Sequence, residues 1–481
     1  MDMKRQTAVL LGLLCIVLGK VLPPVGGLSP AGMQVLGIFA GVLIMWLTIA
    51  IHWPSLLGIA MLATVPGLNL NKLLAVSVGN STFSFLLFTF MCTYALSKTP
   101  FVKRCAIGFI CSKIARKGSW WFLISYCASV LIIGMVMSPV VLFVIYLPIL
   151  DAICQELQLK NKDSLTNSLV LGQLICAEMS CGMTPIAHVF PIMALGFYSS
   201  ATGRTIAYGD YMLFAVPVGV ICFIALMLIF RFVLRPDMSK IANLDFDALQ
   251  KTVPPMGKYE KTVLGICSLV VVMWIVPGFL KSSFPGIYQF FKVQGTAFPP
   301  LVGASLLCLL TLDGKPLLDF KEVVSKGVDW SSIIMAAGTL ALGAAMTNKS
   351  VGITAWITSS IAPILQNASA TMLIVFIIAW ASIQTNVSSN MVTVTVVTAI
   401  AIPLCNATNG AVNTAVICAL IGMIASYAYA TPPAHPAVAL AIGSEKTTTG
   451  QVLKLGIAMM VIAIAVTVLV GYPLGVVVLG A

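Results

Sequence analysis

The sequence is dominated by long apolar runs that are separated by short polar or basic stretches. Three of the clearest runs cover residues 35–47, 263–276 and 457–471. They lack the alternating segments of about ten residues that mark the strands of a membrane barrel. The pattern therefore predicts helices. At about 20 residues for each crossing, the chain is long enough for about ten to twelve spans.

Composition supports this interpretation, because charge is too scarce for a water-facing surface. Of the 481 residues, 59% are hydrophobic and 9% are charged, whereas a typical soluble domain is about 25% charged. A soluble enzyme, a secreted factor and a disordered scaffold are thereby excluded. We expect an all-α polytopic membrane protein that has the lipid bilayer as a partner.

The net charge of +12 is concentrated in basic clusters between apolar runs, chiefly at 98–117 and 231–261. Basic loops beside membrane helices lie on the cytoplasmic side, so these clusters indicate orientation rather than a nucleic-acid partner. Lys4 and Arg5 predict a cytoplasmic N-terminus. One uncharged span follows Lys454 and would leave the C-terminus outside if the number of spans is odd. We expect a cytoplasmic (inner) membrane location.

The 13 cysteines lie mostly within apolar runs, and none forms a C-x-x-C pair. We interpret them as small buried hydrophobic residues. We predict neither a disulfide framework nor a metal centre of the cysteine type, and we expect no organic cofactor.

The two halves of the chain share a motif at a constant offset of 247 residues. The segment 184–188 (Thr-Pro-Ile-Ala-His) corresponds to 431–435 (Thr-Pro-Pro-Ala-His), and Gly196 corresponds to Gly443. Because the chain has only three histidines, a chance match of this quality is not expected. Internal repeats of this kind are typical of secondary transporters.

The longest hydrophilic stretch lies between the two copies, where a linker between repeats would fall. We therefore predict a first inverted repeat over 1–230, a cytoplasmic linker over 231–261 and a second inverted repeat over 262–481. Within the linker, residues 243–250 could form a short amphipathic helix.

Each copy of the motif interrupts a helical run with proline. Proline removes a backbone donor and disfavours helix in the residue before it. Unwound backbone at membrane depth is tolerated where it lines a cavity or is buried in protein. A simple proline kink is the alternative interpretation, but two breaks at equivalent positions favour a binding site.

Several segments resemble the divalent anion/sodium symporter family of the ion transporter superfamily. The resemblance covers nearly the whole chain, from about Leu28 to Leu479, and the order of its motifs is specific. The first motif is segment 256–261, which is followed by Trp274, and the next are Val328-Asp329-Trp330 and 337–342. Ser389 and Asn390 resemble the family's hairpin tip, with Thr385 four residues upstream, and 430–433 resembles its Ala-Thr-Pro-Pro break.

The resemblance implies about 11 transmembrane helices plus two re-entrant hairpins in two inverted repeats. It also implies a scaffold domain, a transport domain that moves as an elevator, and a homodimer. Substrates of the family are small organic anions, mostly di- and tricarboxylates such as succinate, malate, 2-oxoglutarate and citrate. Transport is coupled to sodium or proceeds by anion exchange.

The resemblance also assigns site residues in this chain. The cation site is expected at Thr385, Ser388, Ser389, Asn390 and the carbonyl of Ala430, with sodium held chiefly by Thr385, Ser389 and Asn390. The substrate is expected between the two tips and the two breaks, at Ser138, Thr184, His188, Asn390, Met391, Thr431, Pro432, Pro433 and His435. Met391 stands where the family normally has threonine.

The first hairpin tip departs from the family pattern. It maps to Ser138, Pro139 and Val140, and Gly134 stands where the upstream hydroxyl should be. The first cation site thereby loses two side-chain oxygens. Glu178, the only acidic residue deep within an apolar stretch, is a possible proton site, although pairing with a lysine or a backbone cap is its structural alternative.

We predict a secondary active transporter of small organic anions rather than an enzyme. A sodium/proton antiporter or an inorganic-anion (sulfate-type) carrier is the first alternative. An intramembrane enzyme that uses Glu178 and the histidines is a remote alternative, because no recognisable nucleophile or metal triad accompanies them.

Overall fold

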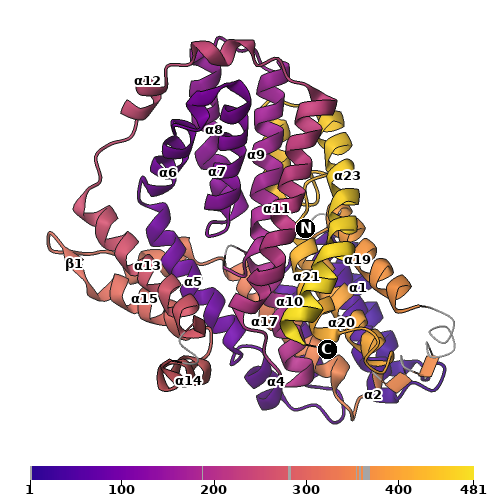
Figure 1. Cartoon of the computed structure of the whole chain (residues 1–481). Helices are drawn as coiled ribbons and strands as arrows, with labels where there is room; N and C mark the ends of the chain where they lie inside the picture. The colour runs from indigo at the N-terminus through magenta and orange to yellow at the C-terminus, as the bar shows by residue number, and fades with distance from the viewer. Residues whose placement is uncertain are drawn as a thin grey trace.

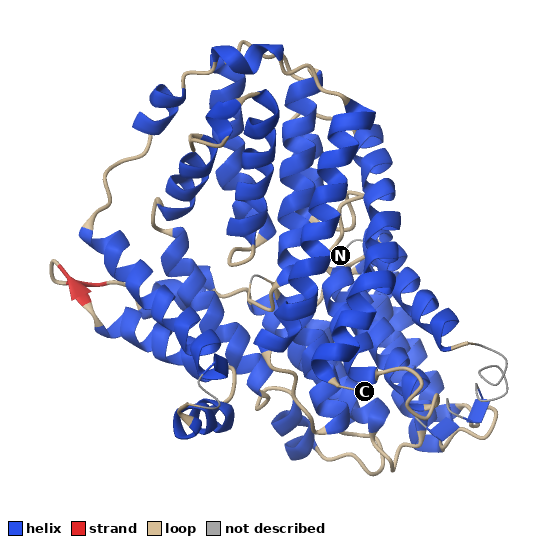
Figure 2. Cartoon of the chain, viewed as in Figure 1, coloured by secondary structure: helices blue, strands red, loops and turns tan. Residues whose placement is uncertain are grey.

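The computed structural model describes residues 3–186, 188–279, 283–353, 355–356, 359–360 and 369–480. In this part of the chain the regular elements are helices, apart from a small hairpin of β1 (Thr311–Leu312) and β2 (Lys315–Pro316) (Figure 2). Backbone groups find no water in a bilayer and must bond within helices or closed barrels. The prediction of an all-α polytopic protein is confirmed.

Among the described residues, six helical stretches are long and apolar enough to cross a membrane, and a bent pair adds a seventh. The six are α2 (Pro30–Thr48), α8 (Pro139–Glu156), α11 (Tyr208–Ile229) with η2 (Phe230–Leu234), α17 (Trp330–Thr347), α19 (Ala370–Val387), and α23 (Thr449–Val466) with η5 (Thr467–Gly471) and α24 (Tyr472–Leu479). The pair is α4 (Leu70–Val76) and α5 (Ser81–Ser97), bent by 47°. Shorter apolar helices complete the bundle.

One order of elements occurs twice: a hairpin, a broken helix and a long helix. The first copy comprises α7 (Ser119–Gly134), α8, α9 (Ser164–Met183), α10 (Val189–Thr202) and α11. The second copy comprises α19, α20 (Asn390–Asn406), α21 (Thr414–Ala425), α22 (Pro436–Gly443) and α23. The hairpin α7–α8 lies toward one end of the molecule and α19–α20 toward the other (Figure 1). Two inverted repeats would place the hairpins in this way, and the division into repeats at 1–230 and 262–481 stays a prediction.

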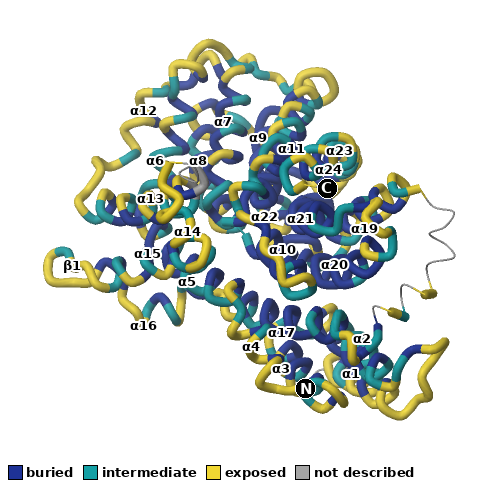
Figure 3. Tube along the Cα trace, turned by 60° about the horizontal axis from the view of Figure 1, so that its bottom comes forward, coloured by how far each residue is buried: buried dark blue, intermediate teal, exposed yellow. Residues whose placement is uncertain are grey.

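The centre of the molecule is formed by α9, α10, α20 and α21, which are buried along most of their length (Figure 3). Every residue of α9 from Leu165 to Met183 is buried. A helix that is covered on all sides contacts protein rather than lipid. Polar side chains of these four helices therefore face other parts of the protein and not lipid.

The remaining helices surround this centre. They are α1 (Met3–Val21), α3 (His52–Leu62), α6 (Phe101–Ile110), η1 (Ala115–Lys117), α13 (Lys258–Phe279), α14 (Pro285–Gln294), α15 (Phe298–Leu309), and α16 (Phe320–Glu322) with η4 (Val323–Gly327). Helix α17 packs against α3 and α10, whereas α5 packs against α13 and α15.

The hydrophilic middle of the chain contains η3 (Ser239–Asn243) and α12 (Phe246–Lys251). The short helix expected at 243–250 therefore begins later. Its start is fixed by Asp245, whose side chain accepts hydrogen bonds from the backbone N–H groups of Asp247 and Ala248. These bonds hold the pKa of the Asp245 carboxyl below its ordinary value.

Candidate functional site

Each hairpin reverses at a short tip inside the bundle. Four non-helical residues, 135–138, separate α7 from α8, whereas two, 388–389, separate α19 from α20. Ser138 and Ser389 are the residues before the second arm of each hairpin and occupy equivalent positions. The N-termini of α8 and α20 thus face the tips, and a helix N-terminus favours an anion.

Each tip is tied to the broken helix of its own repeat by a threonine. The hydroxyl of Thr184 donates to the carbonyl oxygen of Met135. The hydroxyl of Thr431 donates to the carbonyl oxygen of Asn386 at 2.5 Å. The two bonds are equivalent in the repeat, so the Thr-Pro motif anchors a tip as well as interrupting a helix.

The second break is organised by the side chain of Asn386. Its Oδ1 accepts from the backbone N–H groups of Tyr429 and Ala430 at 3.0 and 2.9 Å. Its Nδ2 donates to the carbonyl oxygens of Ser382 and Tyr427, both at 2.9 Å. One buried amide therefore satisfies several backbone groups that the break removes from helical hydrogen bonding.

The expected cation ligands lie around this break. Thr385 donates its hydroxyl to the carbonyl of Ala425 at 2.6 Å, which leaves its oxygen able to accept. Both amide atoms of Asn390 are buried and have no hydrogen-bond partner among the described residues. A buried unpaired amide costs free energy unless a ligand satisfies it.

Two further expected ligands are more weakly defined by the structure. Ser388 donates its hydroxyl to the carbonyl oxygen of Gln384 in α19 at 2.9 Å, and Ser389 is half-buried at the tip.

The backbone at Ala430, whose carbonyl is the last expected ligand, packs closely against Gly456 of α23. A Cβ atom on Gly456 would come within 2.5 Å of the Ala430 Cα. Hydroxyl, amide and carbonyl oxygens are the ligand type that a hard cation prefers.

The first tip is built differently. At Gly134, the position equivalent to Thr385, a Cβ atom would lie 2.0 Å from the hydroxyl oxygen of Ser180. The tip therefore has no room for a threonine, and a hydroxyl from α9 occupies that space. The first tip has Met135 where the second has the Asn386 amide.

The two broken helices meet through ionisable side chains. His435 Nδ1 lies 2.6 Å from Glu178 Oε1, and both side chains are buried. The ring of His188 is 5.8 Å from that of His435, centroid to centroid. His188 and His435 are the residues immediately before α10 and α22. The alternative in which Glu178 pairs with a lysine is therefore wrong.

A cavity of about 390 Å³ reaches the first tip and the first break. Its lining includes Ser138 and His188, together with Thr89 and Thr93 of α5. The hydroxyl of Thr89 and the Nδ1 of His188 are buried without hydrogen-bond partners among the described residues. Lys326 and Asp329 also line this space.

Charge at the basic edge of the cavity is partly paired. Tyr94 of α5 and Lys98, the residue that follows α5, donate to the carboxylate of Glu322 at 3.0 and 2.6 Å. The bond from Lys98 is the main reason that the pKa of Glu322 lies below its ordinary value. Asp329 accepts from the backbone and the hydroxyl of Ser332 at the start of α17.

The structure divides the expected substrate residues. Ser138 and His188 line the cavity, whereas the others do not. Pro432 and Pro433 are exposed, and Thr431 is half-buried. Thr184, Asn390 and His435 are buried.

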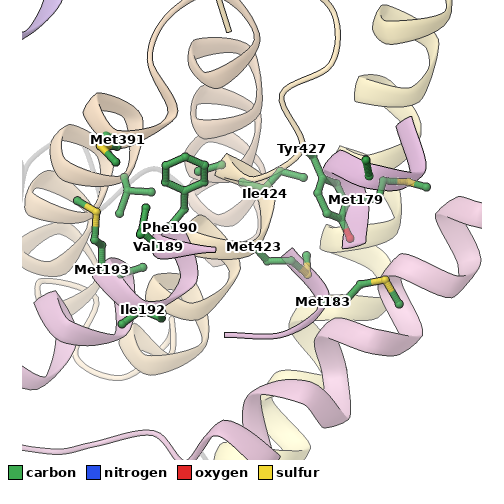
Figure 4. Close-up of a cluster of buried hydrophobic side chains, with 14 of the residues drawn as sticks. Met179, Met183, Val189, Phe190, Ile192, Met193, Met391, Met423, Ile424 and Tyr427 are labelled. Atoms are coloured by element: carbon green, nitrogen blue, oxygen red, sulfur yellow. The ribbon is translucent and has the colours of Figure 1, made fainter. Parts of the chain in front are cut away.

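Met391 lies in an apolar cluster rather than in the cavity. It is 8% exposed and lies near Phe190 and Met193 (Figure 4). A thioether fills irregular apolar space, so Met391 serves the packing between α10 and α20 in this arrangement.

Two contributing residues were not expected from the sequence. Asn386 lies between the motif residues Thr385 and Ser388 and was assigned no role. An amide side chain within an apolar helix was the sequence feature that could have indicated it. Ser180 gave no signal, because its relation to Gly134 depends on how α9 packs beside the tip.

Comparisons with known proteins agree with this arrangement. The family model described as the sodium:sulfate symporter transmembrane region matches residues 4–480. The sodium-dependent dicarboxylate transporter SdcS of Staphylococcus saprophyticus is 25% identical over 487 residues, which cover 97% of this chain and 91% of that protein. An uncharacterized transporter of Haemophilus influenzae is 21% identical over 464 residues, which cover 96% and 95%.

The fold also resembles a solved structure. The crystal structure of the Alcanivorax borkumensis YdaH transporter matches with a TM-score of 0.52, over 96% of this chain and 97% of that chain, at 11% identity. At this identity the likeness concerns the fold.

Proposed function

The chain belongs to the divalent anion/sodium symporter family, and from that premise we propose that it carries small di- or tricarboxylates across the membrane. Members of this family are transporters and not enzymes. The observation that best supports the proposal is the buried amide of Asn390, which has no protein partner among the described residues. It lies at the N-terminus of α20, where a carboxylate is favoured.

We infer that sodium is the coupling ion and binds beside the second tip. Thr385, Ser388, Ser389, Asn390 and Ala430 would supply its oxygen ligands. The relative SdcS is named a sodium-dependent dicarboxylate transporter, which supports both the ion and the substrate class. The substrate would contact Ser138 and His188 from the cavity side, and Thr184, Thr431 and His435 would hold the breaks behind it.

The first expected result concerns Asn390. Asn390→Ala should weaken substrate binding at least about tenfold, because a hydrogen bond to a charged group contributes about 1.5–3 kcal/mol. The measurement is succinate uptake into proteoliposomes under an imposed sodium gradient. Thr398→Ala is the matched control, since the Thr398 hydroxyl is also buried in α20 and has no partner among the residues that the structure describes, but it lies two turns from the tip. Equal uptake by Asn390→Ala and the wild type would contradict the proposal, and uptake of sulfate alone would favour the inorganic-anion alternative.

We further propose a homodimer in which a transport domain moves as an elevator past the scaffold. This rests on the family. The proposed orientation in the inner membrane has a cytoplasmic N-terminus and an external C-terminus. We expect twice the mass of one chain when the particle is weighed in mild detergent and in nanodiscs. A single-chain mass in both would contradict the dimer.

A further inference from the structure

Glu178, His188 and His435 form a buried group that we call the histidine–carboxyl cluster. Glu178 is 1% exposed, and its Oε1 lies 2.6 Å from Nδ1 of His435. An isolated buried carboxylate is costly. The cluster joins α9 and α10 of the first repeat to α22 of the second, beside the two breaks.

The contact between Glu178 and His435 requires a proton. A carboxylate oxygen and an unprotonated imidazole nitrogen are both acceptors, and two acceptors 2.6 Å apart would repel. The backbone N–H of Ala437 also donates to His435 Nδ1, at 3.5 Å, so this nitrogen is an acceptor and the carboxylic acid of Glu178 donates to it. The ring proton of His435 is then on Nε2, and the pair is neutral as a whole.

His188 connects this pair to the cavity. Its Nδ1 is buried without a partner among the described residues, and its ring is 5.8 Å from that of His435. It also lines the 390 Å³ cavity beside Ser138. The cluster therefore has a second basic side chain, and that side chain belongs to a residue that lines the cavity.

We propose that the histidine–carboxyl cluster takes up one further proton when a dianionic substrate binds, and releases it when the substrate leaves. The proton comes from the buffered solution, whose acid component becomes its conjugate base, and it forms one N–H bond on an imidazole. This inference rests on the proposed function. A dianion with one sodium ion and one additional proton is electrically neutral, so the loaded site could cross the membrane without net charge.

No other described group facing the cluster supplies a fixed positive charge. Cys181 of α9 and Tyr429 of the second break are its titratable neighbours. Lys446, which follows α22, is paired with Asp151 of α8 at 2.7 Å. Across the cavity, Lys326 is exposed and Asp329 is bonded to Ser332, so these two contribute opposite charges.

The test is titration calorimetry of the purified full chain with succinate in saturating sodium, repeated in buffers of different ionisation enthalpy. At about pH 7.5 the carboxylates of free succinate are ionised, so proton uptake belongs to the protein. We expect about one proton taken up per succinate bound. His188→Gln should reduce this number to near zero. His52→Gln should leave it unchanged, because His52 is exposed at the start of α3.

The outcomes separate the two proposals. Binding heat with no proton uptake in the wild type would overturn the cluster proposal and leave the proposed function intact. Undiminished uptake in His188→Gln would also overturn it. If neither succinate nor citrate gives binding heat, the proposed function fails and the inference falls with it. The wild-type series needs no variant, so a folding defect in His188→Gln does not affect it.

Discussion

Asn386→Ala is expected to raise the sodium concentration needed for succinate uptake at least about a hundredfold. The side chain of Asn386 pairs with the backbone N–H groups of Tyr429 and Ala430 and with the carbonyl of Tyr427. Removing it leaves three buried backbone groups without these partners, and each costs about 1–3 kcal/mol. A loss of about 3 kcal/mol or more at the break corresponds to at least about a hundredfold weaker sodium binding.

The measurement is the sodium concentration for half-maximal succinate uptake, together with the melting temperature of the purified protein. Met135→Ala is the matched control, because Met135 is equivalent in the first tip and its carbonyl, not its side chain, accepts from Thr184. A normal sodium dependence in Asn386→Ala would show that the break holds its shape without the amide.

Arg104→Met is expected to destabilise the fold without touching the transport site. Arg104 of α6 bonds the carboxylate of Glu260 in α13 through two nitrogens, at 3.0 and 2.8 Å. Glu260 is 2% exposed. The Arg104 side chain is 24% exposed, so the pair is partly buried, and removing the arginine should cost about 1–3 kcal/mol, between the values for exposed and fully buried pairs. The free energy of unfolding should fall by this amount in denaturant titration of the purified protein.

Two comparisons test the cause. The double variant Arg104→Met with Glu260→Met should recover most of the stability, because it leaves no stranded charge. Arg116→Met is the control, since Arg116 and Asp247 form an exposed pair at 2.7 Å and such pairs contribute little to stability. Equal losses in Arg104→Met and Arg116→Met would refute the role of burial.

Helices and breaks could be predicted because their signals are local in the sequence. Long apolar runs identified the spanning helices, and the offset of 247 residues identified both breaks. Ser138 and Ser389 precede the second arms of their hairpins, as the alignment of the tips had predicted. The folded chain nevertheless separates residues that the motifs grouped, since Met391 packs in an apolar cluster away from the cavity.

Other features of the candidate site depend on contacts between distant segments. The partners of Asn386 lie about 40 residues later, and their identity follows from how the second break turns. Glu178 meets His435 only because α22 crosses to the other repeat. The Ser180 hydroxyl lies beside Gly134 because of the way α9 packs against the first tip. The periodicity of apolar residues in the sequence does not specify that packing.

The contact between Glu178 and His435 has a consequence for how the protein is made. The ribosome adds His435 257 residues after Glu178, which at about 5–20 residues per second is a delay of roughly 10–50 s. Throughout that interval the acid is without its histidine, and an acidic residue at the centre of a membrane helix costs about 2.5–3.5 kcal/mol to insert. Helix α9 should therefore reach its final position in the bilayer late. The first half of the chain would complete its assembly only after the second half has been synthesised.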